Sequence, residues 1–127
     1  MTESGAAVLV VDDEPDVCWA LKRILDASGI LSLVTASAHD ALRLVGRERF
    51  VLAFVDAKLP DGDGLELARR IQEVVPGLKI VLISGYYYPD DADVAEALAA
   101  GVIDGFVSKP FVHDEIRNLA RHAIDRQ

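Results

Sequence analysis

Four short apolar segments of this chain end in polar residues that could take part in phosphate or metal chemistry. The residues at these ends are Asp12, Asp13, Asp56, Ser84 and Lys109. If the segments are parallel strands, their carboxyl ends lie at one edge of a sheet, which is where open α/β sheets bind ligands. Three carboxylates, a hydroxyl and an ammonium gathered there suit a divalent cation together with a phosphoryl group.

The three aspartates are the centre of this prediction. Two like charges about 4 Å apart repel by roughly 4 kcal/mol at an effective dielectric constant near 20. Three neighbouring carboxylates are therefore tolerated only with a cation, a nearby base or a raised pKa. Magnesium is the expected cation, because it takes oxygen ligands and commonly combines one or two carboxylates with phosphate. The alternative is that Asp12 and Asp13 only cap the helix that follows them.

The other two residues are less specific when each is taken alone. A lysine at a strand end is usually solvated, but Lys109 precedes Pro110 and would face the three acids, so we expect it to pair with them and with phosphate. A serine at a strand end, such as Ser84, commonly caps a helix, and it gains weight only from its neighbours.

Strand and helix patterns alternate along the whole chain. Continuous apolar runs, which are typical of strands buried on both faces, predict strands over 6–11, 31–36, 51–56, 79–84 and 103–107. Residues with helical spacing predict helices over 16–27, 38–47, 65–75, 90–100 and 111–124, and the turn-rich stretch 59–64 is expected to be a loop. Val112 is among the residues expected on the inner face of the last helix. Such alternation predicts an α/β fold, a parallel sheet with helices on both faces.

Length and composition narrow the class of protein. With 127 residues, a single domain over 1–127 is expected, with no output domain after it. The net charge of −8 argues against nucleic-acid binding through this chain. Cys18 is the only cysteine, which excludes an internal disulfide and fits a cytoplasmic protein. No segment resembles a signal peptide or a membrane span.

Four motifs resemble those of the receiver domain of two-component response regulators. They are Val-Asp-Asp-Glu-Pro at 11–15, Val-Asp-Ala-Lys-Leu-Pro-Asp-Gly-Asp-Gly at 55–64, Ile-Ser-Gly at 83–85 and Ser-Lys-Pro-Phe at 108–111. Each motif is modest alone, but all four occur in order at strand ends. The resemblance covers almost the full chain and implies a doubly wound, flavodoxin-like, five-stranded sheet in the order 2-1-3-4-5.

The resemblance also implies a role for each acid. Asp56 would be the phosphoacceptor, taking a phosphoryl group from a sensor histidine kinase or a histidine phosphotransfer protein. Asp13 and Asp56 would bind Mg²⁺ directly together with the backbone carbonyl of Lys58, and Asp12 would act mainly through a bound water. The expected chemistry is self-phosphorylation and autodephosphorylation only, so the chain is not expected to be an enzyme.

A conformational switch is implied in the same way. Ser84 would bind a phosphoryl oxygen, and Lys109 would pair with another through a turn with a cis Lys109–Pro110 bond. Phe106 stands at the position of the aromatic residue that swings inward in the family, although ordinary core packing is an alternative. The stretch after Ser84 is longer than usual and contains Tyr86–Tyr88, so the partner-binding face is expected to differ. The expected output is altered protein binding, and a phosphate shuttle without conformational output is the alternative.

Two other classes of protein fit the sequence less well than a receiver domain. Haloacid-dehalogenase-like phosphatases carry a second aspartate two residues after the nucleophile, where this chain has Lys58. A flavin-binding electron carrier would need a hydroxyl- and glycine-rich loop after the first strand, where this chain has acids. Trp19 falls on the polar stripe of the first helix, where it could anchor a phosphodonor or only pack beneath an arginine side chain.

Overall fold

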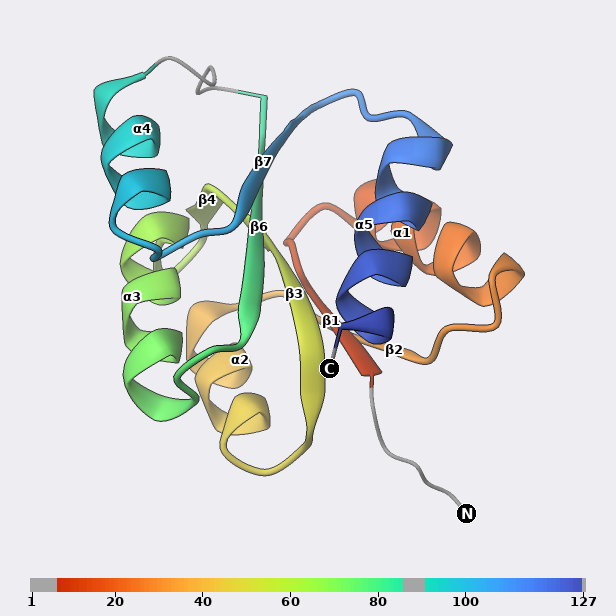
Figure 1. The fold of residues 1–127 in the computed structure, drawn as a ribbon, viewed down its shortest axis with the longest axis horizontal. Helices are drawn as coiled ribbons and strands as arrows, with labels where there is room; N and C mark the ends of the chain where they lie inside the picture. Colours follow the sequence, from red (N-terminus) through yellow and green to blue (C-terminus); the bar gives the residue numbers. More distant parts are fainter. Residues whose placement is uncertain (1–6, 86–90, 127) are drawn as a thin grey trace.

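The computed structural model describes residues 7–85 and 91–126, which form one parallel sheet with helices on both faces (Figure 1). The strands of this sheet are β1 (Ala7–Val11), β2 (Ser32–Thr35), β3 (Phe50–Asp56), β6 (Lys79–Ser84) and β7 (Gly105–Ser108). The helices are α1 (Pro15–Ala27), α2 (Ala38–Val45), α3 (Gly64–Val74), α4 (Ala92–Ala99) and α5 (His113–Asp125). None of the helices in these residues is long and apolar enough to cross a membrane.

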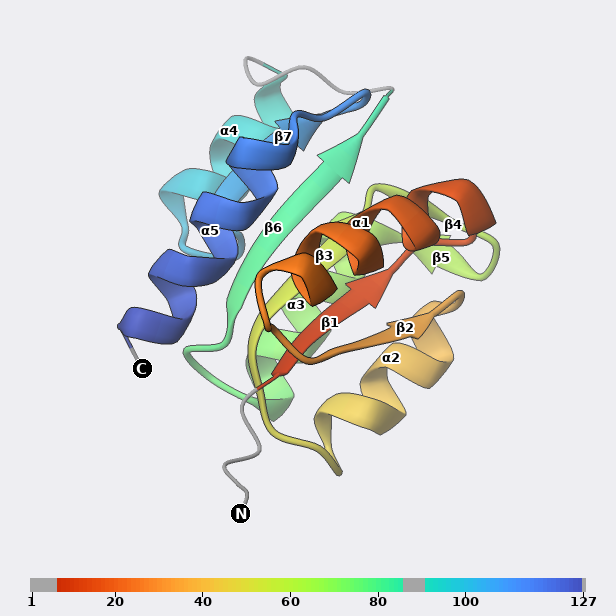
Figure 2. The ribbon, with the colours of Figure 1, turned by 90° about the vertical axis from the view of Figure 1, so that its right-hand side faces the viewer.

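The strands lie in the order β2-β1-β3-β6-β7, and every neighbouring pair is parallel. Counting only these five strands, this is the predicted order 2-1-3-4-5. The predicted class of fold and sheet topology are therefore confirmed. Figure 2 shows the sheet twisted, with β2 at one edge and β7 near the other.

Two apolar clusters hold the helices on the sheet. One cluster joins α2, α3 and α4 to one face, and the other joins α1 and α5 to the opposite face (Figure 1). Alternate residues of β1 serve the two clusters, with Leu9 in the first and Val10 in the second. Because β1 and β3 are buried along their whole length, their carboxyl ends are fixed by packing on both faces.

The turn after β3 contains structure where the sequence predicted only a loop. A short antiparallel hairpin, β4 (Lys58–Leu59) and β5 (Gly62–Asp63), leads directly into α3. The Asp63 carboxylate caps α3 by accepting a hydrogen bond from the backbone of Leu65 at 2.9 Å. At Gly64 a Cβ would overlap the backbone carbonyl oxygen of Asp56. The start of α3 therefore packs directly behind Asp56, and only glycine fits at the contact.

The last strand and the last helix begin later than predicted. The strand expected from residue 103 begins at Gly105, because the Asp104 carboxylate accepts the hydrogen bond of the Ile80 N–H at 2.9 Å in place of a strand carbonyl. The helix expected from residue 111 begins at His113. Val112, expected to face inward, is the N-cap residue and is 65% exposed.

Smaller boundary differences occur at the other elements. The second strand covers 32–35 and not 31–36, α2 ends at residue 45 and not 47, and α3 ends one residue early at 74. The helix α4 begins at residue 92, and residue 90, where it was expected to start, lies outside the described part of the chain.

Candidate functional site at the carboxyl edge of the sheet

The predicted polar residues meet at one edge of the sheet because neighbouring strands end together. Asp56 is the last residue of β3 and is paired in register with Ile83 of β6. Ser84 is the last residue of β6 and is paired with Ser108, which directly precedes Lys109. The structure therefore brings the predicted residues of β3, β6 and β7 to one edge.

The three aspartates also meet there. Carboxylate oxygens of Asp12, Asp13 and Asp56 all lie within 4.8 Å of one another. Asp12 and Asp56 are buried, whereas Asp13 is exposed. This arrangement gives two fixed carboxylates below the surface and a third that closes the cluster from the solvent side.

Asp12 is held by the turn that leads into α1. Its Oδ1 accepts a hydrogen bond from the backbone N–H of Glu14 at 2.9 Å, and its backbone carbonyl accepts one from the Cys18 thiol at 3.1 Å. Burial raises the pKa of the Cys18 thiol to about 11, so the thiol keeps its proton and remains a donor. The N-cap residue of α1 is Glu14, and its own side chain does not cap the helix. Asp12 supports the start of α1 through the Glu14 N–H, and neither Asp12 nor Asp13 is the N-cap residue.

The crowding of carboxylates changes their protonation. Burial raises the pKa of Asp56 to about 6, and the neighbouring Asp12 charge adds to this effect. The Lys109 ammonium and the backbone N–H of Lys58 act in the opposite direction without cancelling it. Burial also raises the pKa of Asp12 above its usual value. The raised pKa values mean that nearby positive charge does not fully stabilise the ionised Asp12 and Asp56 carboxylates. A bound cation would supply the missing positive charge.

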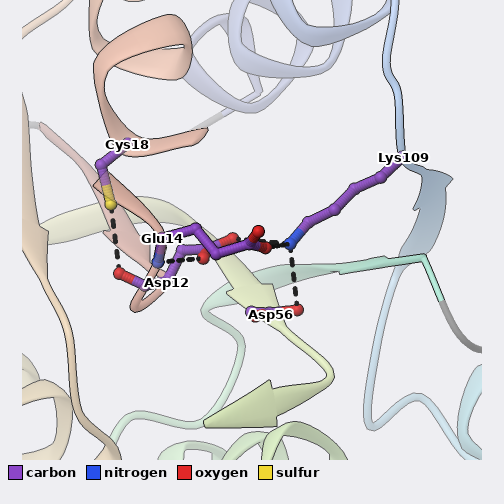
Figure 3. A network of polar contacts seen from close by, with 5 residues as sticks. All are labelled: Asp12, Glu14, Cys18, Asp56 and Lys109. Carbon is purple, nitrogen blue, oxygen red and sulfur yellow. Dashed lines mark hydrogen bonds and ion pairs between the residues drawn. The ribbon is translucent and has the colours of Figure 1, made fainter. Parts of the chain in front are cut away.

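Lys109 reaches across this edge toward the acids, as Figure 3 shows. Its Nζ lies 2.6 Å from Oε1 of Glu14, 3.1 Å from Oδ2 of Asp12 and 3.5 Å from Oδ1 of Asp56. Burial alone would lower the pKa of Lys109, but its short contacts with the Glu14 and Asp12 carboxylates outweigh burial and raise the pKa above its usual value. The Lys109–Pro110 bond is cis, as predicted. The contact with Glu14 was not predicted from the sequence.

The acids fit a divalent cation that prefers oxygen ligands. Oδ2 of Asp12 is buried without a hydrogen-bond partner in the described part of the chain. The Lys109 ammonium lies 3.1 Å from it, so the two form an ion pair without hydrogen-bond geometry. A pocket of about 340 Å³ lies beside the cluster and is lined by Asp13, Glu14, Asp56, Lys58, Leu59 and Pro60. A buried oxygen with a free lone pair next to such a pocket is suited to Mg²⁺ and a small oxyanion.

The comparison with known proteins decides the family. The family model described as "Response regulator receiver domain" matches residues 8–121. The chain belongs to this family. As a receiver domain, it is similar to the response regulator protein PilR of Pseudomonas aeruginosa, with 39% identity over 124 residues that cover 95% of this chain and 26% of PilR. A 14.6 kDa protein of Leptolyngbya boryana is 35% identical over 81% of this chain and 78% of its own length.

Solved receiver structures agree with this assignment. A CheY-like receiver domain protein from Methanospirillum hungatei aligns with a TM-score of 0.87 and 27% identity, covering 97% of this chain and 96% of that chain. The receiver domain of DrrB, solved with beryllofluoride as an activator, aligns with a TM-score of 0.81 and 26% identity over 94% of this chain and 97% of that chain. The chain spans about a quarter of the length of PilR and of several other matched regulators.

The predicted switch residues of this receiver domain, Ser84 and Phe106, lie on the paired strands β6 and β7, two register positions apart. Ser84 is buried, and its backbone carbonyl accepts a hydrogen bond from the Lys109 N–H at 2.9 Å. Phe106 is half-buried, lies opposite Leu82 in the β6–β7 pair, and packs against the cluster that holds α4. Tyr86–Tyr88 lie outside the described residues. The placement of Ser84 and Phe106 is compatible with a switch, and their roles remain predictions.

The side chains of Lys58 and Trp19 are both exposed. The Lys58 side chain is exposed beside the pocket, while its backbone N–H points at Asp56. Trp19 on α1 is 64% exposed, and the Arg23 guanidinium lies 5.0 Å from its ring centroid. The expected exposure of Trp19 is confirmed. Its stacking with arginine is the predicted surface arrangement, and an anchoring role for it remains a prediction.

Proposed function

We propose that this receiver domain accepts a phosphoryl group on Asp56 from a phosphohistidine, in a reaction that needs Mg²⁺. The observation that carries the proposal is the position of Asp56, a buried carboxylate at the end of the central strand β3. Two further carboxylates lie within 4.8 Å of it and the Lys109 ammonium lies at 3.5 Å. Phosphoryl transfer depends mainly on positioning and charge neutralisation, and these residues provide both.

Each residue has a defined part in the proposed reaction. An Asp56 oxygen attacks phosphorus, the P–N bond of the phosphohistidine breaks, and its electron pair leaves with the imidazole nitrogen. Lys109 pairs with one phosphoryl oxygen and the Ser84 hydroxyl donates a hydrogen bond to another. The contact of α3 with the backbone at Asp56 keeps the nucleophile in place.

The acidic residues of the cluster would hold the metal. Asp13 and Asp56 would bind it directly together with the backbone carbonyl of Lys58, and Asp12 would act mainly through a bound water. When bound, Mg²⁺ neutralises charge on the phosphoryl oxygens and on the carboxylates. The same acids without a metal repel an incoming phosphoryl group, which is the physical reason for the proposed requirement.

The proposed partners are a sensor histidine kinase or a histidine phosphotransfer protein, and a downstream protein. The reaction is self-phosphorylation followed by autodephosphorylation, without turnover of a separate substrate. Relatives such as NtrC of Proteus hauseri are named as DNA-binding transcriptional regulators, and this chain covers 24% of that protein. With a net charge of −8, the chain itself is proposed to act in the cytoplasm through protein contacts and not through nucleic acid.

The proposal is tested by phosphorylation with acetyl phosphate, with and without Mg²⁺, followed by intact-mass measurement. A mass increase that requires Mg²⁺ and is lost in Asp56→Asn is expected. Asp40→Asn, which removes an aspartate from the surface helix α2, is the matched control and should be labelled like the wild type. Equal labelling with and without Mg²⁺, or wild-type labelling of Asp56→Asn, would contradict the proposal.

A further inference from the structure

The nearest partner of the Lys109 ammonium is a carboxylate outside the predicted acidic cluster. Oε1 of Glu14 lies 2.6 Å from Nζ, compared with 3.5 Å for Oδ1 of Asp56. A distance of 2.6 Å is slightly shorter than the range of about 2.7–2.9 Å usual for a charge-assisted N–H···O hydrogen bond. Figure 3 shows Lys109 extended toward the turn before α1, with Glu14 meeting its tip.

The backbone of Glu14 is held in place while its side chain is free to change position. Glu14 is the N-cap residue of α1, but its side chain does not cap the helix. Its backbone N–H is fixed by Asp12, which anchors the turn while the side chain remains more than half exposed. The Glu14 carboxylate can therefore turn toward solvent and release Lys109 without disturbing the buried acids.

A phosphoryl group on Asp56 and the Glu14 carboxylate compete for the same ammonium. The phosphoryl oxygens would lie beyond the Asp56 carboxylate, whereas Glu14 holds Nζ on the side of α1. A lysine ammonium is a compact point charge with three donors. Nζ is now held closer to Glu14 than to Asp56, whose Oδ1 is 3.5 Å away, so a phosphoryl group on Asp56 would draw the ammonium away from Glu14.

We propose that Glu14 is a positioning residue that holds Lys109 in the unphosphorylated arrangement and must release it when Asp56 carries a phosphoryl group. This inference rests on the proposed function, because it assigns a regulating role within the same site. Glu14 thus biases the domain toward the unphosphorylated state. Because the ion pair is partly exposed, its bias corresponds to about a two- to fivefold change in an equilibrium constant.

Three variants distinguish the effect of the Glu14–Lys109 contact from the effect of net charge and from a general structural effect. Glu14→Gln keeps the shape and removes the charge, and Glu14→Asp keeps the charge but shortens the reach by one methylene. Asp16→Asn removes the same charge from an exposed position in the first turn of α1. All three are measured at saturating Mg²⁺, because a charge lost near the acids also weakens metal binding.

Two measurements are made on each variant. Beryllofluoride affinity, followed by titration, reports the phosphorylated-like state. The side-chain NMR signals of isotopically labelled lysine report the Lys109 environment in the metal-free protein, since the chain has only four lysines. We expect Glu14→Gln and Glu14→Asp to bind beryllofluoride about two- to fivefold more tightly and to shift the Lys109 signal. Asp16→Asn should do neither.

The outcomes distinguish the inference from the proposed function. Equal effects in Glu14→Gln and Asp16→Asn, with none in Glu14→Asp, would mean that only net charge matters. An unmoved Lys109 signal in both Glu14 variants would mean that the contact is absent. Either result overturns the inference. If the wild type binds no beryllofluoride and takes no phosphoryl group, the proposed function fails, and the regulating role of Glu14 fails with it. Wild-type binding with unchanged Glu14 variants refutes the inference alone.

Discussion

The Lys109 ammonium lies 0.9 Å closer to Oε1 of Glu14 than to Oδ1 of Asp56, at 2.6 Å and 3.5 Å. The Lys109 ammonium therefore points at the acidic edge but makes its shortest contact with Glu14 and not with Asp56. Asp56 keeps a weak ion pair and a raised pKa, which leaves it dependent on additional positive charge. This incomplete compensation, together with the packing that fixes Asp56, should determine how the protein responds to pH, to metal and to substitution.

Ionisation of Asp56 should destabilise the metal-free protein as the pH rises. The pKa of Asp56 is raised to about 6 from a usual 3.8, so the folded state binds this proton more tightly than the unfolded state. This contribution to stability is complete below about pH 4 and is lost as the pH rises through 6. We expect Asp56→Asn to be more stable than the wild type by on the order of 1–3 kcal/mol at pH 7, with little difference at pH 4.

Urea unfolding of both proteins between pH 4 and 8, with a chelator present, measures this difference. Asp16→Asn, at an exposed site, is the control and should show no gain that grows with pH. A difference between Asp56→Asn and wild type that stays flat over the pH range would mean that Asp56 keeps its usual pKa.

Loss of Lys109 should make the stability of the protein depend on Mg²⁺. Lys109→Gln leaves the buried Asp12 and Asp56 without their ammonium partner. We expect a loss of about 1–3 kcal/mol in unfolding free energy at pH 7 without metal, because an unpaired buried charge is costly. Added Mg²⁺ should recover more stability in this variant than in the wild type, since the metal supplies the missing charge.

Chemical unfolding at several Mg²⁺ concentrations measures this rescue. Lys22→Gln removes an exposed lysine on α1 that is 3.8 Å from Asp26 and serves as the control. If Mg²⁺ stabilises Lys109→Gln and Lys22→Gln equally, Lys109 and the metal do not neutralise the same carboxylates.

The packing of α3 behind Asp56 gives a third prediction. Gly64→Ala would place a Cβ against the backbone of Asp56 and Ala57, neither of which can move aside. We expect a loss of about 1–3 kcal/mol in stability, together with slower phosphorylation because the nucleophile is displaced. Gly62→Ala is the matched control, because nothing lies within 4 Å of a Cβ at that position. Similar stability and labelling rates for the two variants would show that the contact behind Asp56 is unimportant.

The sequence predicts the site residues that stand at strand ends and misses the residue that stands in a turn. Asp56, Ser84 and Lys109 were predictable because continuous apolar runs define strands and parallel strands end at one edge. The Glu14 contact was not, because its side-chain direction depends on the turn that the Asp12 carboxylate makes with the Glu14 N–H. The contact also requires Lys109, which directly follows β7, to lie near the turn that follows β1.

Errors in the fold have similar local causes. Val112 has the spacing of an inward-facing helix residue, but the chain is still extended there, and periodicity does not distinguish an N-cap from the first turn. Residue 103 was placed in the last strand because it is apolar. Ile103 is indeed buried, but Asp104 substitutes its side chain for the strand backbone. Both errors lie where a side chain replaces a backbone hydrogen bond or where an element begins.

Phosphorylation should shift an equilibrium that includes Phe106 and α4, beyond the metal pocket itself. Ser84 is buried and its carbonyl is tied to the backbone of Lys109, so movement of either residue toward a phosphoryl group perturbs the β6–β7 pair. Phe106 lies in that pair and packs against the cluster that holds α4. Because packed side chains have discrete alternatives, we expect beryllofluoride with Mg²⁺ to change amide NMR signals at Phe106 and along α4 (Ala92–Ala99).

Mg²⁺ alone should change signals near Asp13 and Lys58. Phe106→Ala should weaken the changes in α4 while leaving beryllofluoride binding in place. Changes confined to the metal pocket in the wild type would support a phosphate shuttle without conformational output.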